Sequence, residues 1–180
     1  MTVDLENPMR ACRLTLTRTR YCRAYCQSRI YVVKEEKMQG PLIFLATFCC
    51  SIFTGAAIYV NVVEHPARMS CGLKVALMEW APSYKRATAM QASLAVLGWG
   101  LSLAAWFFGA NTLILVAGSI LGVVVPFTLL VIMPTNKKLL ALYSQNSTDD
   151  ARILLDRWNK LHMARSALSL ASLIIFLLDK

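Results

Sequence analysis

Residues 87–136, ATAMQASLAVLGWGLSLAAWFFGANTLILVAGSILGVVVPFTLLVIMPTN, form a run of fifty residues without a charged side chain. A single helix of that length would measure about 75 Å, whereas the hydrocarbon core of a bilayer is about 30 Å thick. The run therefore predicts two membrane-spanning helices joined by a tight turn. Residues 108–111, FGAN, are the best position for the turn, because glycine and asparagine tolerate turn geometry. The two spans are then residues 88–108 and 112–133.

Two more apolar segments lie on either side of this run. Residues 41–63, PLIFLATFCCSIFTGAAIYVNVV, carry no charge, and residues 158–178 become free of charge after two polar turns. Each segment is long enough to cross a bilayer. The whole chain is 57% hydrophobic and 16% charged, which is too apolar for an ordinary soluble domain. The sequence therefore predicts an all-α membrane protein, in which residues 41–180 form an antiparallel bundle of four transmembrane helices in contact with the lipid bilayer.

Glycines and prolines indicate how these spans pack and where they end. Gly118 and Gly122 have the spacing of small residues at close helix contacts. Association of several copies of the chain into a homo-oligomer is left open by the sequence. We expect Pro66 to end or redirect the first span, Pro126 to kink the third span and Pro134 to end it.

The first forty residues differ from the rest of the chain. They hold eight of the nineteen Lys and Arg residues, with no acidic residue between Asn7 and Val33. We predict a basic, flexible tail over residues 1–40; a mitochondrial targeting segment is an alternative, and translation from Met38 is another. An endomembrane and a mitochondrial membrane both remain open. Nucleic acid is not expected as a partner, because its binding would need basic side chains on a soluble face with interleaved aromatic residues.

Polar side chains gather at one end of the predicted bundle. In an antiparallel arrangement, the end of span one, the start of span two, the end of span three and the start of span four meet at one membrane face. Trp158, His162 and Arg165 share one stripe of a helix by their spacing. The polar side chains at these four ends are Asn61, Glu64, His65, Tyr84, Gln91, Asn136, Trp158, His162 and Arg165.

Structural roles are also open for these residues. Glu64 and Arg165 have opposite charges and can form an ion pair that fixes helix packing. Trp80 and Trp158 are typical of the aromatic belt at a membrane interface. The six cysteines contain no Cys-x-x-Cys pair, so neither a disulfide framework nor a metal site is predicted.

Three local patterns resemble the anthrone oxygenase-like family of small four-helix membrane proteins. They are Gly55-x3-Tyr59-x-Asn61-x2-Glu64-His65-Pro66, Pro134-x-Asn136-x2-Leu139 and Trp158-x3-His162-x2-Arg165. The resemblance covers about residues 38–178 and leaves the basic tail outside. It implies a four-helix membrane bundle, and oxidation of an anthrone or another lipophilic aromatic substrate by O2 without a metal or other cofactor. Fold is carried over more safely than substrate.

The chemistry that this resemblance implies needs a base, a donor to an oxyanion and an apolar pocket. His162 is the best base, because imidazole titrates near neutral pH. Arg165 or Asn136 is expected to stabilise the enolate oxygen, with Glu64 orienting a histidine. The predicted catalytic residues are His162, Arg165, Asn136, Glu64 and His65, and the predicted substrate-binding residues are Trp158, Asn61, Tyr59 and Trp80.

Two other functions remain open from the sequence. The first is a structural or assembly protein of an organelle membrane without catalytic activity, in which the polar residues serve stability. The second uses His65 and His162 as axial ligands of a haem between the first and fourth helices. A transporter is disfavoured, because no charge lies near the middle of any span.

Overall fold

The computed structural model describes the backbone of residues 20–179 and the side chains of residues 38–179. This part of the chain is helical throughout, apart from short turns. Two of its segments, η1 and η2, are π-helical turns. In chain order the elements are α2 (Arg20–Tyr59), η1 (Val60–Glu64), α3 (His65–Ser70), α4 (Leu73–Phe107), α5 (Thr112–Phe127), η2 (Thr128–Ile132), α6 (Met133–Gln145) and α7 (Ala151–Leu178).

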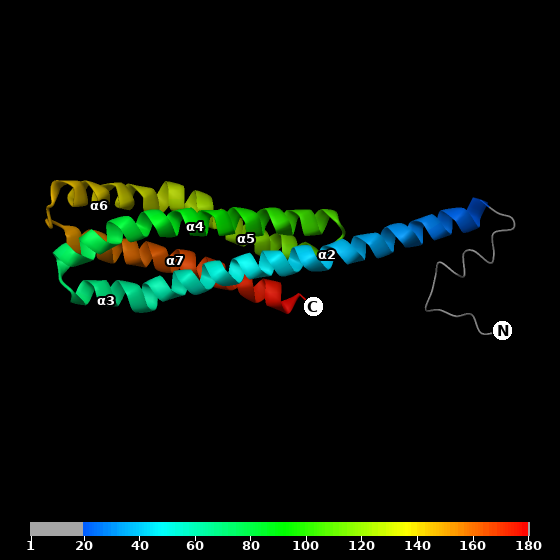
Figure 1. The fold of residues 1–180 in the computed structure, drawn as a ribbon, viewed down its shortest axis with the longest axis horizontal. Helices are drawn as coiled ribbons and strands as arrows, with labels where there is room; N and C mark the ends of the chain where they lie inside the picture. Colours follow the sequence, from blue (N-terminus) through cyan, green and yellow to red (C-terminus); the bar gives the residue numbers. More distant parts are fainter. Residues whose placement is uncertain (1–19, 180) are drawn as a thin grey trace.

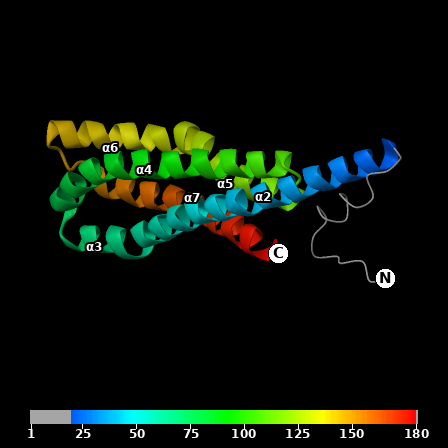
Figure 2. The same cartoon turned by 45° about the vertical axis from the view of Figure 1, so that its right-hand side comes forward.

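Four helical units are long and apolar enough to cross a membrane: Met38–Ser70, Leu73–Phe107, Thr112–Gln145 and Ala151–Leu178. They run antiparallel and side by side (Figures 1 and 2). Each helix packs mainly against two neighbours, in the cyclic order α2, α4, α5, α7, while α6 lies against α4 and α7. The all-α bundle with four membrane-spanning helices is therefore confirmed.

The turn between the second and third spans lies where the sequence predicts it. Helix α4 ends at Phe107, and Gly109 follows with a φ of 88°, a left-handed conformation that glycine adopts at little cost. Asn111 caps α5, because its side-chain oxygen accepts a hydrogen bond from the Leu113 amide at 3.1 Å. The prediction of a turn over residues 108–111 is confirmed.

The helices continue past the two prolines that were expected to end them. The first helical unit reaches Ser70 and the third reaches Gln145, so the expectation that Pro66 or Pro134 ends its helix is wrong. A proline ring crowds the carbonyl four residues earlier and offers no N–H. That carbonyl lies within η1 for Pro66 and within η2 for Pro134. The wider hydrogen bonding of a π-helical turn accommodates the ring. As a result, the segments between the predicted spans, residues 64–87 and 134–157, are mostly helical.

The glycine pair of the third span is used inside the bundle. A Cβ atom on Gly118 would collide with the side chain of Ser102 on α4, and one on Gly122 would lie 3.0 Å from the Trp99 ring. Helices α4 and α5 therefore approach closely through these glycines. By contrast, a Cβ atom on Gly55 of α2 would meet nothing within 4 Å.

Helix α2 begins well before the predicted start of the first span. Its backbone is continuous from Arg20 through residues predicted to belong to the flexible tail, and it extends past the other helices (Figure 1). This differs from a flexible segment up to residue 40. The remainder of the predicted tail, residues 1–19, lies outside the described residues.

Two apolar clusters divide the bundle along its length and leave a polar layer between them. One cluster contains Phe53, Ala95 and Leu121, and the other contains Trp80 and Leu139. Buried polar residues fall between these clusters in sequence on several helices, for example Gln91 on α4 and His162, Arg165 and Ser166 on α7. The fold thus places a polar site inside an apolar bundle.

Candidate functional site

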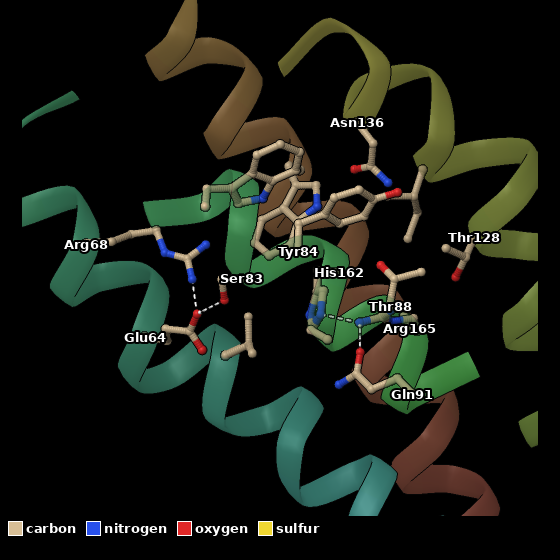
Figure 3. A pocket seen from close by; sticks show the side chains of 15 residues that line it. Glu64, Arg68, Ser83, Tyr84, Thr88, Gln91, Thr128, Asn136, His162 and Arg165 are labelled. Carbon is tan, nitrogen blue, oxygen red and sulfur yellow. Dashed lines mark hydrogen bonds and ion pairs between the residues drawn. The ribbon is translucent and has the colours of Figure 1, made fainter. Parts of the chain in front are cut away.

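All four helical units contribute to one small cavity in this polar layer (Figure 3). Its volume is about 20 Å³ for a water-sized occupant, which is enough for about one water molecule. Two groups of polar side chains lie on different sides of it: Glu64, Arg68 and Ser83 on one side, and Gln91, His162 and Arg165 on the other. The lining residues are Val60, Glu64, Arg68, Trp80, Ser83, Tyr84, Ala87, Thr88, Gln91, Thr128, Ile132, Asn136, Trp158, His162 and Arg165.

Arg165 is the buried cation of the second group. It is 7% exposed and donates hydrogen bonds to Gln91 Oε1 at 2.5 Å and to His162 Nε2. Its guanidinium carbon lies 5.6 Å from the centre of the Phe53 ring. Within residues 38–179, no carboxylate lies within ion-pair distance of it. A buried charge without a partner costs several kcal/mol, so this guanidinium is suited to an anionic group in the cavity.

The hydrogen bonds of His162 define its protonation state. A guanidinium group can only donate, so His162 Nε2 accepts from Arg165, and the proton of the neutral ring lies on Nδ1. Nδ1 then donates to Asn61 Oδ1 at 3.0 Å. Asn61 is itself held by Ser166, whose hydroxyl donates to the same oxygen at 2.6 Å, and by Asn159, whose Oδ1 accepts from Asn61 Nδ2 at 2.7 Å. Asn61 therefore orients His162 by holding its Nδ1 atom, and Asn61 itself does not line the cavity.

We expect Asn61→Leu to release His162 from this orientation. The buried Nδ1–H would lose its acceptor, which costs about 1–3 kcal/mol of unfolding free energy. The ¹⁵N chemical shifts of His162 should change from those of a single tautomer to those of a mixture. Val62→Leu, at an exposed neighbouring position, is the control and should change neither quantity. Unchanged His162 shifts in Asn61→Leu would contradict the assignment.

The ion pair predicted between Glu64 and Arg165 is not formed, because Glu64 pairs with another arginine. Arg68 on α3 donates to Glu64 Oε1, and its Nε lies 2.7 Å from Glu79 Oε2. Ser83 also donates to Glu64 Oε1 at 3.0 Å. The physical reason is that the helix continues past Pro66 and brings Arg68 one turn after Glu64. Glu64 therefore orients neither histidine by any hydrogen bond of the described residues.

Aromatic rings fill the space between the two polar groups. Trp80 is fully buried and Trp158 is 5% exposed, so neither belongs to a lipid-facing belt. Trp80 stacks on Tyr84 at a centroid distance of 4.9 Å and meets Trp158 edge-on at 5.8 Å. The Trp158 ring also contacts His162 at 4.9 Å and His65 at 6.0 Å. A substrate ring would have to displace one of these partners in order to stack on Trp158.

Besides Asn61, two predicted site residues lie outside the cavity lining. Tyr59 is 55% exposed, because it occupies the outer face of α2 immediately before η1. His65 is buried against Trp158, and its Nδ1 atom has no partner among the described residues. The arrangement therefore gives no contact between either residue and a ligand in this cavity.

Several buried polar atoms of the site have no hydrogen-bond partner in the described part of the chain. They include Gln91 Nε2, Arg165 Nε, both side-chain polar atoms of Asn136, and Trp80 Nε1. Leaving a buried polar atom unpaired costs about 1–3 kcal/mol, so these atoms indicate a position for a ligand or water. The sequence placed Gln91 among the polar side chains at this end of the bundle, but no catalytic or binding role was predicted for it. Its signal was available, because it is an amide inside a charge-free membrane span.

The arrangement is unfavourable for a haem between His65 and His162. Both ring nitrogens of His162 are engaged, one by Arg165 and one by Asn61. Across residues 38–179, no group of three or more His, Cys, Asp or Glu side chains is placed to hold a metal ion.

Comparison with known proteins agrees with this picture. The family profile described as Anthrone oxygenase matches residues 80–175, which are 96 of the 180 residues. The match includes His162 and Arg165 and excludes Asn61 and Glu64, which precede it. Neither the curated proteins nor the solved structures give a significant match. With more than half of its length matched and four helices apolar enough to cross a bilayer, the chain is a membrane protein of the anthrone oxygenase family.

Proposed function

We propose that this protein oxidises a lipophilic aromatic substrate with O2 in the cavity between its four helices. The observation that carries the proposal is the contact between a neutral histidine and a buried arginine without a carboxylate partner. Such a pair offers a base and a cationic hydrogen-bond donor within one small cavity lined by polar and aromatic side chains. These are the two groups that formation of an enolate requires.

For an anthrone, the reaction replaces a CH2 group by a carbonyl group. A base removes one proton from the CH2 carbon, and the electrons move onto the oxygen of the opposite carbonyl. The carbanion form then combines with O2 to give a hydroperoxide after protonation. The hydroperoxide loses water and leaves the quinone, so one oxygen atom of O2 remains in the product and the other leaves as water.

The contact between Arg165 and His162 suggests how binding prepares the base. In the free site, the Arg165 hydrogen bond occupies the lone pair of His162 Nε2. A substrate carbonyl oxygen that accepts the Arg165 hydrogen bond releases this lone pair for the carbon-bound proton. Asn61 holds the opposite side of the ring in the tautomer that this step needs. Gln91 and Asn136 supply further donors for the developing oxyanion.

A three-ring substrate requires the cavity to open, because the present volume holds about one water molecule. Tyr84 and Thr88 on α4 and Thr128 on η2 are only half buried, whereas His162, Arg165 and Asn136 are buried. We place the route for the substrate between α4 and η2, where the lining residues approach the lipid-facing surface. The substrate would then enter from the bilayer, with its oxygen pointing at Arg165.

Replacing His162 with alanine is expected to reduce anthrone-dependent O2 uptake by about 100-fold or more, because general-base catalysis contributes about 10²–10⁴-fold. The assay uses purified protein in detergent and subtracts the rate with heat-denatured protein, since anthrones oxidise slowly on their own. Lys160→Ala, at an exposed position of the same helix, is the control and should keep wild-type uptake. Full uptake by folded His162→Ala would remove His162 as the base.

A structural role without catalysis is the second candidate, and one observation favours it. Arg68, Glu64 and Glu79 join α3, η1 and α4 in a compact ion cluster next to the buried tryptophans, an arrangement that fixes helix positions. Under this candidate, the polar residues of the cavity serve stability alone. The two candidates differ in the effect expected from replacing Arg165.

A further inference from the structure

We infer that the cavity binds its organic ligand as an anion, such as a phenol whose proton has been released to solvent, with Arg165 as the counter-cation. This inference rests on the proposed function and specifies the charge of the ligand. It follows from how the site distributes its carboxylates, from which hydrogen-bonding atoms remain unpaired, and from the size of the cavity.

Two arginines line the cavity, and the carboxylates are divided unequally between them. Arg68 is 6% exposed and contacts both Glu64 and Glu79. Arg165 is 7% exposed and, within residues 38–179, lies within ion-pair distance of no carboxylate. The two side chains are equally buried, so solvent does not explain the difference. A negative charge supplied by a ligand would offset the desolvation of Arg165, as Glu64 and Glu79 do for Arg68.

The atoms left for a ligand are mainly hydrogen-bond donors. Gln91 is 2% exposed and Asn136 is fully buried, and the NH2 group of each has no partner in the described part of the chain. The indole N–H of Trp80 is unpartnered as well. Glu64 Oε1 accepts from Arg68 and Ser83, and Asn136 Oδ1 is the one fully buried acceptor of the lining without a partner in the described part of the chain. A lining rich in donors and poor in acceptors selects an oxyanion over an amine or another cation.

The cavity volume specifies how such a ligand enters. About 20 Å³ accommodates one oxygen-sized group, so the anionic oxygen occupies the space beside Arg165 and Gln91. The rings of the ligand then lie toward the half-buried residues Tyr84, Thr88 and Thr128. Burial of the charged end and exposure of the apolar end to lipid suit an acidic phenol that dissolves in the bilayer.

The test measures binding without O2, so that turnover does not contribute. Full-length protein in detergent is titrated anaerobically with an acidic hydroxyanthraquinone and, separately, with the O-methyl ether of the same compound. We expect the hydroxy compound to bind about tenfold more tightly or better, a difference of about 1.4 kcal/mol, because a hydrogen bond to a charged oxygen is stronger than one to a neutral ether oxygen. We also expect the absorption band of its phenolate to appear on binding at a pH where the free compound is neutral.

Arg165→Gln should reduce this preference to about twofold or less and abolish the phenolate band. Arg157→Gln, an exposed arginine of the same helix, should retain both. Equal binding of the hydroxy compound and its ether by wild type, or a bound ligand with the spectrum of the neutral phenol, would overturn the inference, and neither result depends on a variant that folds. Binding with these properties but without O2 turnover would refute the oxygenase and leave the anion site intact. Turnover without any preference for the hydroxy compound would refute the anion site and leave the oxygenase intact.

Discussion

Arg165→Met is expected to reduce O2-dependent turnover by about 100- to 1,000-fold, the loss typical of removing one donor to a developing oxyanion. The same substitution should leave the free energy of unfolding unchanged or increase it. Gln91 Oε1 and His162 Nε2 lose a donor, which costs about 1–3 kcal/mol each. In exchange, a buried cation without a carboxylate partner in the described part of the chain is removed, which relieves several kcal/mol.

This divergence between activity and stability separates the oxygenase from a purely structural protein. If Arg165 only held the helices together, Arg165→Met would destabilise the bundle and reduce its abundance. The matched control is Arg157→Met, at an exposed position of α7, which should alter neither turnover nor unfolding. Turnover within about threefold of wild type, or a loss of turnover that only follows a loss of stability, would contradict the role given to Arg165.

Gly118→Leu is expected to lower the free energy of unfolding by about 3 kcal/mol, at the upper end of overpacking effects. The added Cβ would collide with the Ser102 side chain, with the Gly98 carbonyl oxygen 3.7 Å away. Neither neighbour can move without separating α4 from α5, because Gly98 presents its backbone and Ser102 is bonded to the Gly98 carbonyl at 2.7 Å. Reversible unfolding in mixed micelles with increasing denaturing detergent measures the effect.

Gly100→Leu is the matched control for this substitution. Gly100 lies on α4, one of the two helices involved, and a Cβ atom there would meet nothing within 4 Å. Leucine at this lipid-facing position should be neutral or slightly stabilising, because glycine is a poor helix former. Equal effects of the two substitutions would show that α4 and α5 do not approach through Gly118.

The fold was predictable because its signals are long and redundant. Fifty residues without a charge cannot form one membrane helix, and the positions of Gly109 and Asn111 locate the turn between two. Helix ends were harder to predict. Pro66 and Pro134 normally stop a helix, and the π-helical turns that accommodate them depend on hydrogen bonding that residue patterns do not reveal. The predicted loops were therefore too long and the helices too short.

The candidate site was predictable as a location but not as a set of contacts. The antiparallel topology brings His162, Arg165 and Asn136 to the same layer, as expected from their places at the span ends. Arg68 was missed because it lies beyond Pro66, where the helix was expected to have ended. Its presence gives Glu64 a different partner and leaves Arg165 without one among the described residues. Tyr59 was included because of its sequence neighbours, but its side chain lies on the outer face of α2.

The most direct measurement is oxidation of an anthrone by purified protein in the presence of isotopically labelled O2. Mass spectrometry of the quinone measures both its rate of formation and its content of label. We predict formation well above the rate with heat-denatured protein, one labelled oxygen atom in each quinone molecule, and a fall to the denatured-protein rate in His162→Ala and Arg165→Met. Quinone formation at the same rate with native and denatured wild-type protein would contradict the proposed oxygenase.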